Sequence, residues 1–104
     1  MIDSELRKLL IAQIGHELTA HQTYLGIALY FERQSLKRWG GLFRALSGEE
    51  AQHAAKIMEF LTDNAIDFDL PALKASSTKY ESAAAACKRA LKSERDVTVQ
   101  FEHM

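Results

Sequence analysis

A chain of 104 residues is long enough for one domain with a modest hydrophobic core. Its 47% hydrophobic and 26% charged residues are typical of globular proteins, and a formal net charge of −1 gives no electrostatic basis for binding nucleic acid or an anionic membrane. No apolar run approaches the roughly 18 residues of a membrane span, the N-terminus lacks the features of a signal peptide, and the single cysteine, Cys87, excludes an internal disulfide, so we expect a cytoplasmic protein.

The first predicted helix spans residues 4–33, with Asp3 or Ser4 as its N-cap. Apolar residues recur in it at alternating steps of three and four, which places them on one face. This stripe consists of Leu10, Ile14, Glu17, His21, Tyr24, Ala28 and Phe31. Glu17 is an acid inside an apolar seam. Taken alone, it can be interpreted as a partly solvated carboxylate paired with Arg or Lys.

The second predicted helix spans residues 36–64, with Ser35 as its N-cap, and the short break before it makes the first two helices antiparallel. Its stripe consists of Phe43, Leu46, Glu50, His53, Ile57 and Phe60. A buried carboxylate and imidazole one turn apart must find partners, and a divalent metal suits both Glu50 and His53. Gly48 could allow close approach of a neighbouring helix.

Residues 64–77 have no helical period and contain the only proline, Pro71. A helix of about 28 residues is roughly 42 Å long, and about 14 extended residues reach roughly 46 Å. This length predicts a crossover that runs back along the bundle and makes the second and third helices parallel.

The third predicted helix spans residues 78–104 and opens with a capping box from Thr78 to Glu81. Its stripe consists of Tyr80, Ala84, Cys87, Leu91, Glu94, Thr98 and Phe101. Glu94 therefore has the same kind of seam position as the acids of the first two helices. Cys87 is interpreted as a packing residue of this seam.

Each of the three helices thus places one glutamate in an apolar seam. Buried carboxylates repel one another unless they are protonated or bridged by cations, and helix bundles build di-iron cages from inward glutamates and Glu-x-x-His pairs. The alternative is a polar layer in the core, in which His21, His53 and Tyr24 satisfy the three acids. His21 is interpreted as a hydrogen-bond partner or cavity-lining residue rather than a ligand.

Several motifs together resemble the ferritin family, in particular bacterial ferritins without haem. They are Glu17-Leu18-Thr19-Ala20 followed by Tyr24-Leu25, then Glu49-Glu50-Ala51-Gln52-His53-Ala54, and finally Glu94. The resemblance extends from the first helix through most of the third. It implies an all-α, ferritin-like four-helix bundle with a di-iron ferroxidase centre, which assembles into a hollow shell and stores iron after oxidising iron(II) with dioxygen or peroxide.

The resemblance also implies roles for the matched acids and histidine. Glu17 and His53 would bind the first iron, Glu50 would bridge both irons, and Glu94 would bind the second. Glu49 would be an accessory iron ligand.

Two further positions bear on the reaction. Tyr24 would be the tyrosine near the catalytic centre. Ala51 stands where bacterioferritins have a haem-ligating methionine, which argues against haem.

Ferritin subunits have a fourth long helix with further ligands, and we expect this single domain, residues 1–104, to end before it. The exposed seam then predicts a homo-oligomer, because contiguous apolar surface normally marks an interface. Ferroxidase activity would require another chain or a missing segment to complete the site. The alternative function is a truncated, weak or inactive ferritin-like module that self-associates by helix exchange.

Overall fold

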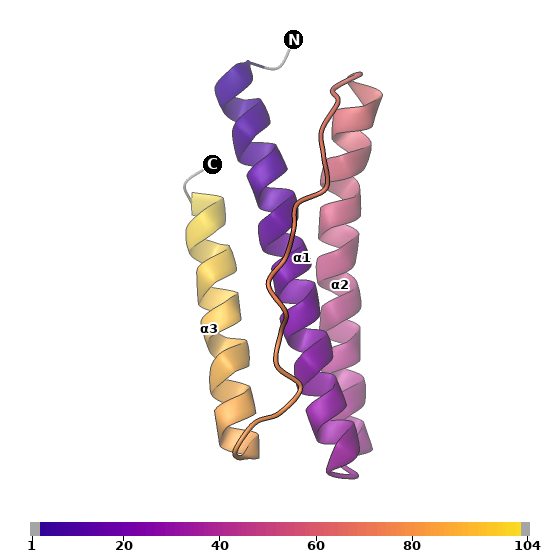
Figure 1. Cartoon of the computed structure of the whole chain (residues 1–104), viewed down its shortest axis with the longest axis vertical. Helices are drawn as coiled ribbons and strands as arrows, with labels where there is room; N and C mark the ends of the chain where they lie inside the picture. The colour runs from indigo at the N-terminus through magenta and orange to yellow at the C-terminus, as the bar shows by residue number, and fades with distance from the viewer. Residues whose placement is uncertain (1–2, 103–104) are drawn as a thin grey trace.

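Three long helices make up the computed structural model, which describes the backbone of residues 3–102 and the side chains of residues 3–96. They are α1 (Ser4–Arg33), α2 (Lys37–Asp63) and α3 (Ala83–Glu102), and the described backbone contains no strand. α1 and α2 are antiparallel neighbours, and the connector of residues 64–82 runs back along α1, so that α3 is parallel to α2 (Figure 1). The predicted all-α fold, antiparallel first pair and long crossover are confirmed.

The start of α1 agrees with the sequence prediction, whereas the cap of α2 does not. The Asp3 side chain accepts a hydrogen bond from the Leu6 backbone N–H at 2.8 Å. Ser35, the predicted cap of α2, instead has a φ of 61°, and Leu36 is the N-cap without a side-chain bond. The tight reversal between the two helices requires one residue in the left-handed region, and Ser35 takes that position.

α3 begins at Ala83, later than predicted, so the capping box from Thr78 to Glu81 is wrong. The Ser82 hydroxyl oxygen accepts a hydrogen bond from the Ala85 N–H at 3.1 Å instead. The carbonyl of Thr78 accepts a hydrogen bond from the Arg33 guanidinium at 2.8 Å, which keeps this stretch in the connector.

The connector lies directly against α1 because Gly26 has no side chain. An added Cβ at Gly26 would overlap the carbonyl oxygen of Ser77. This close approach fixes the lower part of the connector on α1. Gly48, which could have admitted a neighbouring helix, has no described atom within 4 Å of an added Cβ.

One side of the bundle is open, because α2 and α3 do not pack against each other in the described part of the chain. The α3 seam faces this side, where Leu91 is 52% exposed. Cys87 is exposed as well, so its interpretation as a residue packed against other described residues is wrong. Thr98 and Phe101 are outside the described side chains. Among the described residues, no helix combines the length and the apolarity that a membrane span needs.

Candidate metal centre

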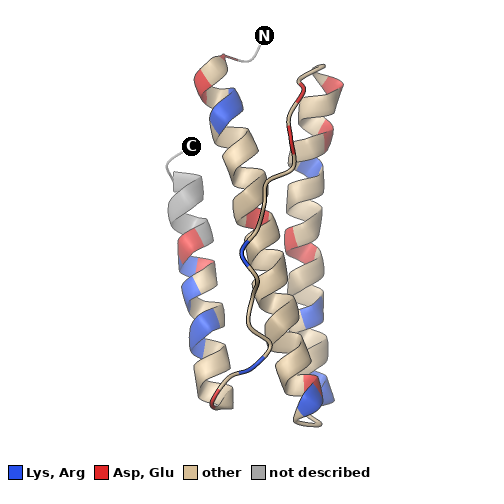
Figure 2. Cartoon of the chain, viewed as in Figure 1, with Lys and Arg blue, Asp and Glu red and all other residues tan. Residues whose placement is uncertain are grey.

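Glu17 of α1 and Glu50 and His53 of α2 converge on one point midway along the bundle. One ligand atom from each lies within 4.8 Å of the other two. The His53 Nδ1 is 3.5 Å from Oε2 of Glu17 and 3.5 Å from Oε2 of Glu50. Figure 2 shows acidic positions on all three helices at a similar level. The one-turn spacing places Glu50 and His53 on the same face of α2, and this face lies against Glu17 of α1.

The two carboxylates are buried without enough partners. Glu17 is fully buried and Glu50 is 7% exposed. The Gln13 amide donates a hydrogen bond to Oε1 of Glu17 at 3.2 Å. Oε2 of Glu17 and Oε2 of Glu50 are buried and have no hydrogen-bond partner among the described side chains. Orphaned carboxylate oxygens beside an imidazole nitrogen are a donor set that fits a divalent cation.

The electrostatics of Glu50 also favour a positive partner. Burial, followed by the adjacent Glu17 carboxyl group and the charges of Glu94 and Glu49, raises the pKa of Glu50 to about 8. In the metal-free protein at neutral pH, Glu50 therefore holds a proton. A cation that binds here must displace that proton, so binding and protonation compete.

Tyr24 and Glu94 form a second polar contact close to this group. The Tyr24 hydroxyl donates a short hydrogen bond to the Glu94 carboxylate. Burial and then the Glu94 contact raise the pKa of Tyr24 well above its usual value, so the phenol stays protonated. Glu94 is not a member of the three-residue group, but its charge contributes to the raised pKa of Glu50.

The remaining polar residues of the two seams have other contacts. The His21 Nδ1–H donates to the Ser47 carbonyl at 3.0 Å, and the Ser47 hydroxyl donates to the His21 carbonyl at 2.8 Å. The interpretation of His21 as a hydrogen-bond partner is confirmed, although its partner is not a glutamate.

Glu49 is exposed and outside the group of three. Gln13 was missed, although it precedes Glu17 by one turn on the same face.

The group is accessible from the open side of the bundle. The His53 side chain is 48% exposed, and Glu94 is exposed on α3. A cation or an additional protein segment can therefore reach the group between α2 and α3.

Known proteins match almost the whole chain. The ferritin-like domain family matches residues 7–104. The chain is 29% identical over 103 residues to ferritin BfrB of Mycolicibacterium smegmatis, an alignment that covers 99% of this chain and 57% of that protein. It is 28% identical over 104 residues to the bacterial non-heme ferritin of Staphylococcus epidermidis, covering all of this chain and 63% of that protein.

The fold has solved counterparts as well. A structure described as a humanized archaeal ferritin superposes with a TM-score of 0.92 at 27% identity, over 99% of this chain and 62% of that chain. The chain therefore spans about 60% of the length of these proteins.

Proposed function

Because the chain belongs to the ferritin family, we propose that it binds iron(II) at Glu17, Glu50 and His53 and takes part in iron storage in the cytoplasm. The observation that carries the proposal is the pair of buried carboxylate oxygens that face one imidazole nitrogen. Oxygen and nitrogen donors together suit iron. Haem has no part in the proposal, because Ala51 stands at the position of the ligating methionine.

The finer proposal is oxidation of the bound iron(II), with iron as the substrate. Each iron(II) ion gives one electron to dioxygen or peroxide, and the iron(III) formed leaves as oxide. The pKa of Glu50 is raised both by Glu17 on α1 and by the charge of Glu94 on α3, which suits a carboxylate that would bridge two irons. Glu94 would hold the second iron, Tyr24 would position Glu94, and exposed Glu49 would supply an accessory site.

Aerobic addition of iron(II) tests this proposal. We expect the wild-type protein to oxidise iron(II) faster than Glu50→Ala, because the variant loses the bridging carboxylate. Glu59→Ala is the matched control, since it removes an exposed acid from the same helix. Equal oxidation rates for wild type and Glu50→Ala would overturn the proposal.

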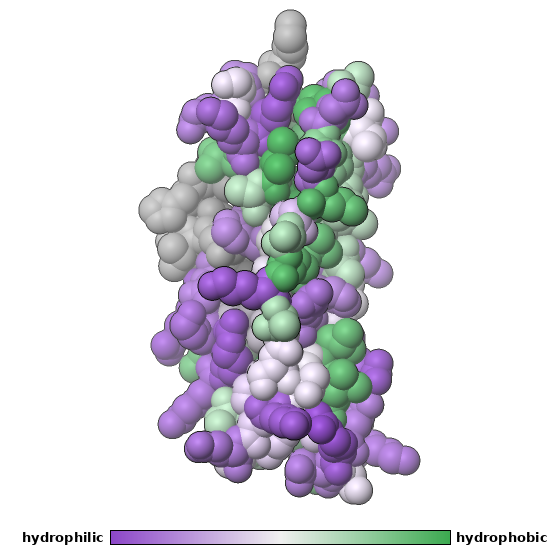
Figure 3. Space-filling view, viewed as in Figure 1, coloured by the Kyte–Doolittle hydropathy of each residue, from purple (hydrophilic) through white to green (hydrophobic). Residues whose placement is uncertain are grey.

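The open side of the bundle favours a second candidate, a self-associating module with little or no turnover. α2 and α3 do not pack on each other within the described chain, and Phe60 and Leu91 are 45% and 52% exposed. Apolar residues also gather on the face over which the connector runs (Figure 3). Leu70, a residue of the connector, is 68% exposed. A second copy that covered these surfaces would form a homo-oligomer.

Light scattering together with iron stoichiometry separates the two candidates. A discrete small oligomer that retains no iron would favour the module. An oligomer that retains and oxidises iron would favour the ferritin-type function. Under both candidate functions, we expect the chain to be oligomeric rather than a stable monomer.

A further inference from the structure

A cavity of about 300 Å³ lies between α1, the connector and the first half of α3. This volume is at the low end of the range of about 300–1,000 Å³ for small-molecule pockets. Two of its lining residues, Lys74 and Arg89, are basic and none is acidic. The cavity shares no residue with the candidate metal centre. Its lining therefore has the charge of an anion site, on a protein whose net charge is −1.

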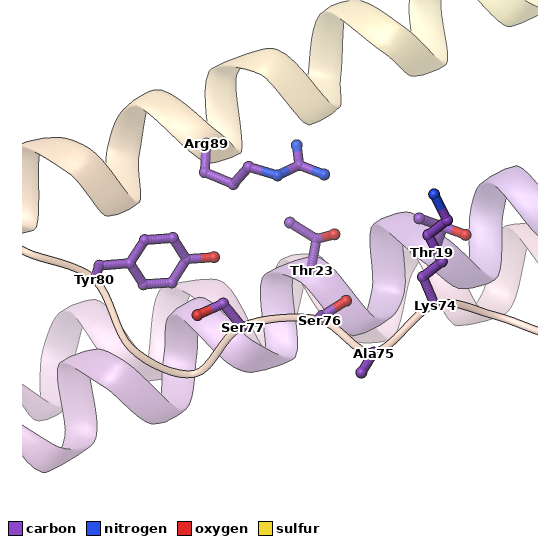
Figure 4. A pocket seen from close by; sticks show the side chains of 8 residues that line it. All are labelled: Thr19, Thr23, Lys74, Ala75, Ser76, Ser77, Tyr80 and Arg89. Atoms are coloured by element: carbon purple, nitrogen blue, oxygen red, sulfur yellow. The ribbon is translucent and has the colours of Figure 1, made fainter.

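Arg89 is the most informative of these residues. In Figure 4 its guanidinium extends from α3 toward Thr23 of α1. Nη1 of Arg89 is buried and has no hydrogen-bond partner among the described side chains. Arg89 as a whole is half-buried. A guanidinium stays charged at every physiological pH, and a buried N–H of a charged group costs free energy when it has no acceptor. Arg89 therefore offers a buried N–H group that a negatively charged ligand could accept a hydrogen bond from.

Hydroxyl groups complete the inner wall of the cavity. Tyr80 and Thr23 point toward the same space as Arg89 in Figure 4. Burial raises the pKa of Tyr80, although the charge of Arg89 opposes the shift, so the phenol remains a hydrogen-bond donor. The Ser77 hydroxyl already accepts from the Lys79 N–H and donates to its carbonyl, so it contributes no free donor.

The mouth of the cavity carries the second cation. Lys74 and Thr19 are exposed and line the end of the cavity away from Tyr80 in Figure 4. The connector can form this wall only because Gly26 permits its close approach to α1. A ligand would thus enter past an ammonium group and reach the guanidinium at the inner end.

We propose that this cavity binds a small oxyanion of the phosphate class. Arg89 would form charge-assisted hydrogen bonds to two of its oxygens, as guanidinium groups do with phosphate. Tyr80 and Thr23 would donate to the remaining oxygens, and Lys74 would add attraction at the mouth.

The test is a titration of inorganic phosphate into the full, metal-free chain, followed by calorimetry or by ³¹P NMR. We expect saturable binding to wild type, and an affinity lower by about tenfold or more in Arg89→Gln, because charged hydrogen bonds are lost. Arg95→Gln is the matched control, since it removes an exposed arginine from the same helix outside the cavity, and it should bind like wild type. The absence of saturable binding to wild type, or equal affinities of wild type and Arg89→Gln, would overturn the proposal.

Two further variants guard against misfolding and against binding at the metal centre. Lys74→Gln lies in the exposed connector and should weaken binding by about threefold, with a shallower salt dependence. If circular dichroism shows that Arg89→Gln has lost helix, Lys74→Gln becomes the deciding variant. A phosphate affinity equal to that of wild type in Lys74→Gln would then refute the site. His53→Gln, which removes the basic side chain of the metal centre, should leave phosphate binding intact. Loss of binding there would assign the anion to the metal centre and refute the proposal.

Discussion

The Tyr24 hydroxyl on α1 donates a hydrogen bond to the Glu94 carboxylate on α3, 70 positions further along the chain. The bond joins α3 to the α1–α2 pair close to the candidate metal centre. The charge of Glu94 raises the pKa of Glu50, and the charge of Glu50 contributes to the raised pKa of Tyr24. The Tyr24–Glu94 bond therefore fixes where an acid of α3 lies relative to the acids of the other two helices.

Removing this hydroxyl should weaken the attachment of α3. We expect Tyr24→Phe to lower the free energy of unfolding by about 1–2 kcal/mol, because a hydrogen bond to a charged group is lost. Iron(II) oxidation should also slow, because Glu94 is no longer held. Urea unfolding and an aerobic oxidation assay measure the two effects.

Tyr30→Phe is the control for that substitution. Tyr30 is a core tyrosine whose described contacts are ring packing against Phe31 and Tyr80. Equal effects of the two substitutions would contradict a specific role for the Tyr24–Glu94 bond.

The raised pKa of Glu50 predicts how stability depends on pH. In the metal-free protein, Glu50 has a pKa of about 8, against an ordinary value of 4.5. Below about pH 4.5 the folded and unfolded chains both hold the proton. As pH rises from 4.5 to 8 the unfolded chain releases it first, so the contribution of Glu50 to stability falls through this window.

Urea unfolding across this pH range measures the effect. Glu50→Gln should flatten the decline, because a neutral amide replaces the titrating group beside Glu17. Glu49→Gln, a change at the exposed neighbour, should retain the decline. An identical pH profile for wild type and Glu50→Gln would show that Glu50 does not titrate in this way.

Metal binding should stabilise the fold through the same residues. Under the proposed function anaerobic iron(II) would bind the folded chain, so we expect the melting temperature to rise with iron concentration, by an amount equivalent to about 2.7 kcal/mol at a hundredfold excess over Kd. Chelation should reverse the rise, and His53→Ala should greatly reduce it. A rise of the same size in His53→Ala would exclude this residue as a ligand. Thermal melts with and without chelator provide the measurement.

Gly26 should be far less tolerant of alanine than Gly48, although both lie in helices. Gly26→Ala brings a Cβ against the Ser77 carbonyl, so the connector must shift, which typically costs about 1–3 kcal/mol. Gly48→Ala meets no described atom within 4 Å and should gain up to about 1 kcal/mol of helix propensity. Urea midpoints of the two variants test the difference. Destabilisation by Gly48→Ala would point to a neighbouring chain packed at that position.

The positions of the three candidate ligands could be predicted from the sequence, because the helical period determines which residues share a face. Steps of three and four place Glu17 on the inner face of α1, and a one-turn spacing places Glu50 beside His53, so the contact among them follows from local geometry. The connector could be predicted as a crossover from its length alone.

Features that depend on tertiary contacts were harder to predict. The start of α3 is shifted because Arg33 holds the Thr78 carbonyl. The exposure of Cys87 depends on which helix lies opposite α3, and the apolar period does not specify that. The anion cavity was not foreseen, because residues of an aperiodic connector form much of its wall.

The long connector also has a consequence for the order of folding. α1 and α2 are joined by a tight reversal, so their pairing needs no long loop to close, whereas α3 packs on α1 only after residues 64–82 have traversed the bundle. Closing that larger loop costs more chain entropy and slows the step. We expect the α1–α2 hairpin to form early and α3 to dock last. Backbone amides of α3 should then exchange with deuterium sooner than those in the middle of α1.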